Sequence, residues 1–133
     1  MVVVDTNILA YLLIAGDRTD AARSLFEIDA DWRSDSFALV EFSNILATYE
    51  RRGHLSASEA VRLQRDAEAA LRSLVNIPLI TALDAARRYS ISAYDARFIA
   101  AAEQLDTKLV TEDRKLRAAA PEHTRSLAQA LDA

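Results

Sequence analysis

The sequence contains no cysteine and only two glycines and two prolines among its 133 residues. Without cysteine the chain cannot form a disulfide, a thiolate nucleophile, a zinc–thiolate site or an iron–sulfur cluster, so any metal must be held by oxygen or by His54 and His123. Gly16 and Gly53 are too few and too far apart for a G-x-G-x-x-G dinucleotide fingerprint or a G-x-x-x-x-G-K-S/T phosphate loop. The sequence therefore excludes nucleotide-binding folds of those two kinds.

The chain also lacks an excess of positive charge and a long apolar run. Its 16 basic and 20 acidic residues give a net charge of −4, which argues against nucleic-acid binding by bulk electrostatics and leaves only local basic patches. No apolar run approaches the ~20 residues of a membrane span, and the first residues lack the positive segment of a signal peptide. We therefore expect a cytoplasmic protein, and the length predicts one globular domain over 1–133.

The pattern of apolar residues alternates between strand-like and helix-like segments. Short apolar runs predict strands at 2–4, 32–36, 75–77, 108–111 and 123–127. Helical periodicity and capping residues predict helices at 7–14, 18–28, 37–52, 56–74, 81–89, 92–105 and 113–119, with a helical turn at the end. Because strands alternate with helices, we expect a three-layer α/β/α sandwich around a parallel sheet of four to five strands.

Four acidic residues occupy positions that a merely solubilising charge would not need. Asp5 follows the first predicted strand and Asp113 follows the fourth, and the ligand crevice of an open parallel sheet lies beyond the carboxyl ends of its strands. Glu41 lies on or beside the apolar stripe of its helix, and Asp95 lies on the apolar face of another. A buried charge without a partner is very costly, so these carboxylates are candidates for one shared site.

Carboxylates that converge on one pocket repel each other unless a divalent cation neutralises them. Oxygen ligands suit Mg²⁺, with Mn²⁺ as a substitute, and one or two such ions can activate a water and hold a phosphodiester for in-line attack. Each acid also has a structural alternative when taken alone, and that alternative is weakest for Glu41, because the middle of a helix offers no cap to satisfy. Asp5 can cap the first helix, Asp95 has a capping-box-like spacing from Ser92, and Asp113 can favour a helix start.

The segments that carry these acids together resemble the PIN-domain ribonucleases, and within them the VapC-type toxins of bacterial toxin–antitoxin pairs. The motifs follow one another in order: Val-Val-Asp5-Thr6-Asn7, Leu-Val-Glu41-Phe, Ser-Ala-Tyr-Asp95-Ala before an alanine-rich helix, and Leu-Val-Thr111-Glu-Asp113. The resemblance covers essentially the whole chain. It implies a sheet of order 3-2-1-4-5, a Mg²⁺-dependent endoribonuclease acting on RNA, a homodimer, and inhibition by a small cognate antitoxin.

The resemblance also implies roles for individual residues. The metal-binding and catalytic acids are Asp5, Glu41, Asp95 and Asp113, with Asn7 and Thr111 as polar support. From their closeness in sequence to Asp95 or Asp113, four basic residues are candidates for RNA phosphate contacts, with a solvated helix face as the alternative: Arg97, Arg114, Lys115 and Arg117.

Several further residues complete the set of expectations. Glu112 is expected to face solvent, and the two histidines are expected to be loop residues and not general bases. Trp32 and Tyr94 can stack on bases, although packing is the commoner role for each. The apolar face of the helix at 56–74 is a candidate surface for a second copy or an antitoxin.

Three other functions remain open from the residues alone. A signalling receiver domain also has an acid after its first strand, but it needs an aspartate at the end of the third strand, where Asn76-Ile77-Pro78 stand. A PIN-like nuclease that acts on DNA and a catalytically silent PIN-like binding module are the other two alternatives.

Overall fold

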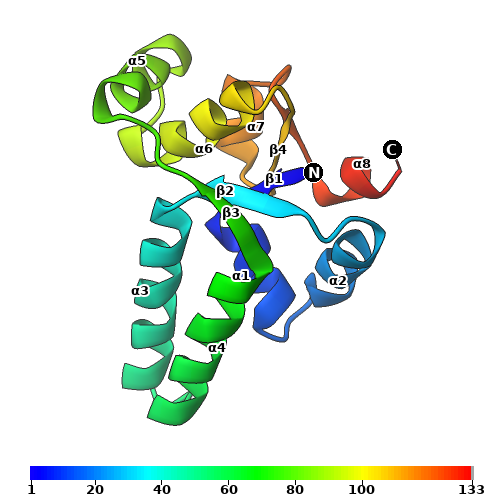
Figure 1. Cartoon of the computed structure of the whole chain (residues 1–133), viewed down its shortest axis with the longest axis vertical. Coiled ribbons are helices and arrows are strands. Elements are labelled where there is room, and N and C mark those ends of the chain that lie inside the picture. The colour runs from blue at the N-terminus through cyan, green and yellow to red at the C-terminus, as the bar shows by residue number, and fades with distance from the viewer. Residues whose placement is uncertain (133) are drawn as a thin grey trace.

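The computed structural model describes residues 1–132 as a five-stranded, fully parallel sheet with helices on both faces (Figure 1). Along the chain the elements are β1 (Val2–Val4), α1 (Thr6–Leu13), α2 (Thr19–Ile28), β2 (Trp32–Asp35), α3 (Phe37–Arg51), α4 (Ala57–Ala70), β3 (Leu71–Val75), α5 (Leu79–Tyr89), α6 (Ala93–Gln104), β4 (Leu109–Val110), α7 (Arg114–Ala119), β5 (Thr124–Arg125) and α8 (Leu127–Leu131). The strand order is β3-β2-β1-β4-β5, so the predicted α/β class and the order 3-2-1-4-5 are confirmed.

The first strand lies at the centre of the sheet and its three valines are buried on both faces. Helices α1 to α4 pack on one side, while α5, α6 and α7 lie on the other (Figure 1). On that second side α6 contacts β1, β2 and β4, and its buried alanines let the helix approach the strands closely. The sequence Ala-Arg-Phe-Ile-Ala-Ala-Ala is therefore nearly all apolar because the helix covers the middle of the sheet.

Helix α4 is shorter than the apolar spacing predicts. The expected helix ran over 56–74, but α4 ends at Ala70, and β3 starts at Leu71 in place of Val75. Residues 71–75 pair in parallel with β2 and satisfy its outer backbone groups, which helical hydrogen bonds within α4 could not do. Because no glycine or proline marks the boundary, tertiary pairing decides it, and local sequence does not.

The expected apolar surplus on this helix is also absent from the part of the chain that the structure describes. The apolar stripe of α4 is buried, and α4 packs against α3 and α1, which leaves Val61 as its one exposed large apolar side chain among residues 1–132. Most of the apolar face predicted over 56–74 is therefore buried within the fold, while Leu74, now in β3, is exposed. No helix among the described residues is both long and apolar enough to cross a membrane.

Candidate active site

The four predicted acids line one open cleft of about 600 Å³ at the carboxyl edge of the sheet. Its walls are formed by Asp5, Thr6, Asn7, Phe37, Val40, Glu41, Asn44, Ile45, Tyr94, Asp95, Phe98 and Asp113. The strand order explains why residues so distant in sequence meet here. The chain builds β2 and β3 on one side of β1 and then β4 and β5 on the other, so the connections diverge between β1 and β4, where a crevice forms.

Asp5 directly follows β1 and is buried at the base of the cleft. Its Oδ1 accepts the N–H of Ile8 at 3.2 Å and thereby caps α1, as the structural alternative for this residue suggested. Its Oδ2 accepts a hydrogen bond from the hydroxyl of Thr111. Asp5 can therefore cap α1 and contribute to the site at once, because the cap uses Oδ1 and leaves Oδ2 to Thr111, the residue that follows β4.

Thr111 links the two strands at which the connections diverge. The residue is fully buried after β4, and its Oγ1 donates to Asp5 while accepting the N–H of Asp113 at 3.1 Å. Asp113 in turn caps α7, since its Oδ1 accepts the N–H of Leu116 at 3.1 Å. The hydroxyl of Thr111 therefore fixes the buried carboxylate of Asp5 relative to the backbone of Asp113, whose side chain is exposed.

Asp95 lies in the first turn of α6, which Ser92 caps by accepting the N–H of Asp95 at 3.0 Å. This confirms the expected helix start. Because Ser92 caps the helix through its own side chain, the Asp95 carboxylate is not consumed as an N-cap. It is half-buried and lines the cleft.

Glu41 is a half-buried carboxylate in the second turn of α3, and its partner is a residue for which the sequence predicted no role. Thr6 Oγ1 donates to Glu41 Oε1 at 2.6 Å, and Thr6 is itself 6% exposed. The hydroxyl between Asp5 and Asn7 therefore ties α1 to α3 across the cleft. The available signal was the need of a mid-helix acid for a nearby donor.

The acids influence one another electrostatically. Burial raises the pKa of Asp5 to about 6, and the charges of Asp113 and Asp95 add to the rise, while the hydrogen bonds from Thr111 and Ile8 oppose it. The pKa of Asp95 is also raised, first by burial and then by the charge of Asp113. Three helix N-termini, those of α1, α6 and α7, point at this group of acids, and their partial positive charge offsets part of the repulsion.

The donor set of the cleft fits a hard divalent cation. Every candidate ligand is a carboxylate, hydroxyl or amide oxygen, which is the set that Mg²⁺ and Mn²⁺ prefer. Across residues 1–132 the acidic and histidine side chains do not form a ready-made group of three metal ligands. The arrangement is instead one of carboxylates that face a common space. The pKa values of Asp5 and Asp95 are raised by burial and, to a smaller extent, by neighbouring acids, a state that a cation would relieve.

The chain matches the family model of the PIN domain over residues 2–121. It belongs to the PIN-domain family. It is 28% identical over 118 residues to Ribonuclease VapC3 of Pyrobaculum aerophilum, a match that covers 86% of this chain and 90% of the relative. Its fold is similar to the crystal structure of PAE2754 from the same organism, with a TM-score of 0.79, 22% identity, and coverage of 98% of this chain and 91% of that one.

The basic residues near the acids of this PIN domain occupy different environments. Arg114 and Lys115 are exposed in the first turn of α7 beside Asp113, and Arg117 is half-buried one turn further. Arg97 does not reach the rim of the cleft: it is engaged by the fully buried Asp35, with Nε 2.9 Å from Oδ2. The expectation that Arg97 is free for RNA phosphate therefore does not fit its contacts.

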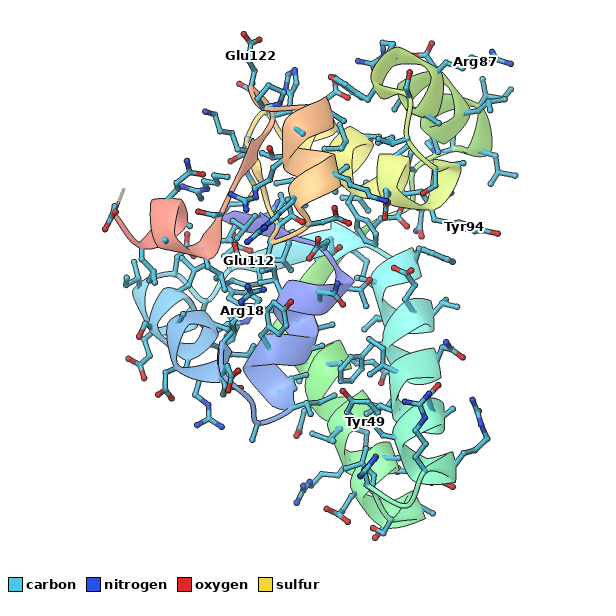
Figure 2. All side chains as sticks on the ribbon, turned by 180° about the vertical axis from the view of Figure 1, so that it is seen from behind. Arg18, Tyr49, Arg87, Tyr94, Glu112 and Glu122 are labelled. Carbon is cyan, nitrogen blue, oxygen red and sulfur yellow. The ribbon has the colours of Figure 1, made fainter. Side chains whose placement is uncertain are left out.

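Glu112 does not face solvent as expected. Its carboxylate accepts the N–H of Leu127 at 3.2 Å, at the start of α8, and lies 3.7 Å from Nε of Arg18 (Figure 2). The side chain is 18% exposed. The prediction was wrong because the sequence gives no sign that α8 begins beside β4, where a carboxylate can receive its first free N–H.

The two aromatic candidates differ in exposure, since Trp32 is buried and Tyr94 is exposed. Trp32 is fully buried and packs edge-on against Phe26 with ring centroids 5.2 Å apart, so it has a core role. Tyr94 projects outward from the start of α6 (Figure 2), is 64% exposed, and stacks on Phe37 at 5.4 Å in the wall of the cleft. Asn7 also lines the cleft, with an exposed side chain. His54 and His123 lie outside it.

Proposed function

We propose that this PIN domain is a Mg²⁺-dependent endoribonuclease and the toxin of a type II toxin–antitoxin system. The observation that carries the proposal is that acids from four segments far apart in sequence line one cleft at the carboxyl edge of the sheet. The name of the relative Ribonuclease VapC3 supports RNA as the substrate. The silent-module alternative is disfavoured because all four acids of the motif are present in the cleft.

Asp5, Glu41, Asp95 and Asp113 are the residues that would hold the cation. When bound, Mg²⁺ supplies charge neutralisation for the phosphate and lowers the pKa of a water, with Mn²⁺ as the substitute. The chain's own contribution is to orient the carboxylates and to oppose the rise in pKa that burial causes. Thr111 does so for Asp5, and the three helix N-termini favour the charged form of the acids around them.

The surroundings of the acids provide contacts for a nucleic-acid strand. The exposed Arg114 and Lys115, and then Arg117, are placed to bind phosphates next to Asp113, in an otherwise acidic chain. The amide of Asn7 is available at the wall of the cleft to orient a water or a phosphate oxygen. Arg97 is left out of this set because its guanidinium is engaged by Asp35.

The deciding experiment is cleavage of total cellular RNA by the purified protein, with Mg²⁺ or with EDTA, beside an identically prepared Asp95→Asn variant. We expect discrete fragments only with Mg²⁺ and with Asp95 intact, because the substitution removes a ligand but leaves its helix cap in place. Single-stranded DNA serves as the second substrate. Cleavage that persists in EDTA or in the variant would contradict the proposed chemistry, and cleavage of DNA alone would move the assignment to a DNA nuclease.

The toxin role makes a separate expectation in cells. Expression of the protein in a bacterial host should arrest growth, and co-expression of a cognate antitoxin, sought in the adjacent gene, should restore it. The Asp95→Asn variant should leave growth unaffected. Growth arrest that the variant also causes would point to toxicity unrelated to the nuclease site.

We also propose that the protein forms a homodimer. The first turns of α5 expose Leu79, Ile80 and Leu83, which are 80%, 82% and 44% exposed, and such an apolar group is typical of a protein contact. The measurement is molar mass by light scattering, where the parent should have twice the chain mass and Ile80→Asp should have the chain mass. A parent that is monomeric at micromolar concentration would contradict the dimer.

Tyr94 is expected to stack on an unpaired base of the RNA. One face of its ring rests on Phe37, and the side chain is otherwise open beside Asp95 in the cleft wall. Because stacking of a base on an aromatic side chain is worth about 1–3 kcal/mol, Tyr94→Ala should lower kcat/KM by roughly 5- to 150-fold, while Tyr94→Phe stays near the parent. Initial cleavage rates at low RNA concentration measure this, and equal rates for the two variants would contradict stacking.

A further inference from the structure

Asp35 is the last residue of β2, and its fully buried carboxylate is the most heavily bonded acid of the structure among residues 1–132. It accepts the N–H of Phe37 at 2.8 Å and the N–H of Ile77 at 2.9 Å. Arg97 completes the set through Nε at 2.9 Å and Nη2 at 3.2 Å, and the same Nη2 donates to the carbonyl of Ile77 at 2.8 Å. One ion pair thus joins three segments of the chain.

Two of these segments carry acids of the site. Phe37 is the first residue of α3, and Glu41 follows it by four residues on the same face of that helix. Arg97 follows Asp95 by two residues in α6, about 200° around the helix, so the two side chains leave on nearly opposite sides. The contacts to Asp35 therefore fix where α3 begins and how α6 is rotated, while neither Asp35 nor Arg97 lines the cleft.

We propose that the Asp35–Arg97 pair is a positioning device that holds Glu41 and Asp95 at the separation that divalent-cation binding requires. The inference rests on the proposed function, because it assigns a role toward the cation of that site. It goes beyond it by giving two residues outside the cleft control over the affinity for the cation.

A buried ion pair is not needed for stability alone. Apolar pairs of similar volume are often as stable, so a buried pair is a weak source of stability and a stronger source of a fixed arrangement. Here Asp35 accepts directional hydrogen bonds from α6 and from the start of α3. An apolar contact in the same place would allow the two helices to rotate or slide.

The chain offers a matched control at the other end of α6. Arg88 on α5 forms a two-bond pair with Glu103 on α6, with both nitrogen–oxygen distances at 3.1 Å. This pair also joins α6 to another segment, but neither residue lines the cleft. If an ion pair on α6 supported the site merely by stabilising the helix, Arg88→Gln would lower the affinity for the cation as much as a substitution at Arg97.

The test is the affinity of the full chain for Mn²⁺, measured by electron paramagnetic resonance and calorimetry without RNA. Arg97→Gln and Asp35→Asn should bind Mn²⁺ about 10- to 100-fold more weakly, as is typical when the support of a metal ligand is removed. Arg97→Lys keeps the charge but offers one donor nitrogen in place of two, so its Mn²⁺ affinity should fall between those of these variants and the parent. Arg88→Gln should stay within about twofold of the parent. In the metal-free protein, amide hydrogen exchange at 93–97 should be faster in Arg97→Gln and unchanged in Arg88→Gln.

Mn²⁺ affinity within about twofold of the parent in a folded Arg97→Gln protein would overturn the inference, as would an equal loss in Arg88→Gln. If Asp35→Asn does not fold, Arg97→Lys and the double variant Asp35→Asn/Arg97→Gln decide, since both keep polar partners at the buried position. Asp95→Asn separates this inference from the proposed function. If it abolishes Mn²⁺ binding while the Arg97 variants do not weaken it, the positioning role alone is rejected; if it leaves Mn²⁺ binding intact, the cation site itself is rejected.

Discussion

Replacing Asp5 by asparagine is expected to abolish RNA cleavage and, without metal, to raise the free energy of unfolding at neutral pH. Loss of a carboxylate ligand removes several kcal/mol of transition-state stabilisation, which corresponds to a rate at least about 100-fold lower. The fold should survive, because asparagine keeps an oxygen that accepts the N–H of Ile8, and its amide can donate to the hydroxyl of Thr111. Activity and stability therefore change in opposite directions.

The gain in stability follows from the raised pKa of this carboxyl, about 6 in the folded protein. The folded state holds the proton of Asp5 more tightly than the unfolded chain, in which the pKa of an aspartate is about 3.9. The contribution of Asp5 to stability is then fully present below about pH 4 and is lost as the pH rises through about 6. At pH 7 the parent bears a penalty of about 1–3 kcal/mol that Asp5→Asn lacks.

Urea unfolding of both proteins in EDTA between pH 4 and pH 8 measures this difference. The parent should lose more stability than the variant between about pH 4 and pH 6, and the two curves should run parallel above that range. Addition of Mg²⁺ should raise the stability of the parent and leave Asp5→Asn nearly unchanged, because ligand binding to the folded state adds stability. A variant less stable than the parent at pH 7 in EDTA would show that burial does not penalise the ionised carboxylate of Asp5.

The placement of the acids was accessible from sequence because it depends on strand ends. Asp5 follows three consecutive valines and Asp113 follows Leu-Val-Thr111, so once a parallel sheet is assumed both must lie at its carboxyl edge. Whether the two acids are neighbours depends on the strand order, and the alternation of strands and helices does not determine that order. The order came from the family resemblance and is confirmed by the pairing of β1 with β2 and β4.

The partners of the acids were not accessible in the same way. Thr6 meets Glu41 over 35 positions of sequence, and Asp35 meets Arg97 over 62, so no local spacing connects either pair. Arg97 was interpreted as a rim residue because it stands two positions from Asp95, but on a helix that spacing points a side chain away from its neighbour. The predicted start of β3 was wrong for a related reason, because pairing with β2 overrides helical periodicity.

Replacing Asp35 by alanine is expected to cost about 3–5 kcal/mol of unfolding free energy, the largest effect on stability of any single side chain discussed above. The substitution leaves the Arg97 guanidinium, 16% exposed, without its counter-ion in a largely buried place. It also leaves the N–H groups of Phe37 and Ile77 without their acceptor, and each unsatisfied buried donor adds to the cost.

The matched control is Glu103→Ala on α6, the helix that also carries Arg97. There the partner Arg88 is 44% exposed and keeps Asp84 as a second acceptor at 3.0 Å, so the loss should be only about 0–1 kcal/mol. Both losses are measured by urea unfolding in EDTA, where the cation cannot mask them. Equal small losses in the two variants would mean that water reaches Arg97 once Asp35 is gone. A large loss confined to Asp35→Ala is the expected result, because Asp35 joins the start of α3, the second turn of α6 and the segment after β3, whereas Glu103 bonds to Arg88 of α5.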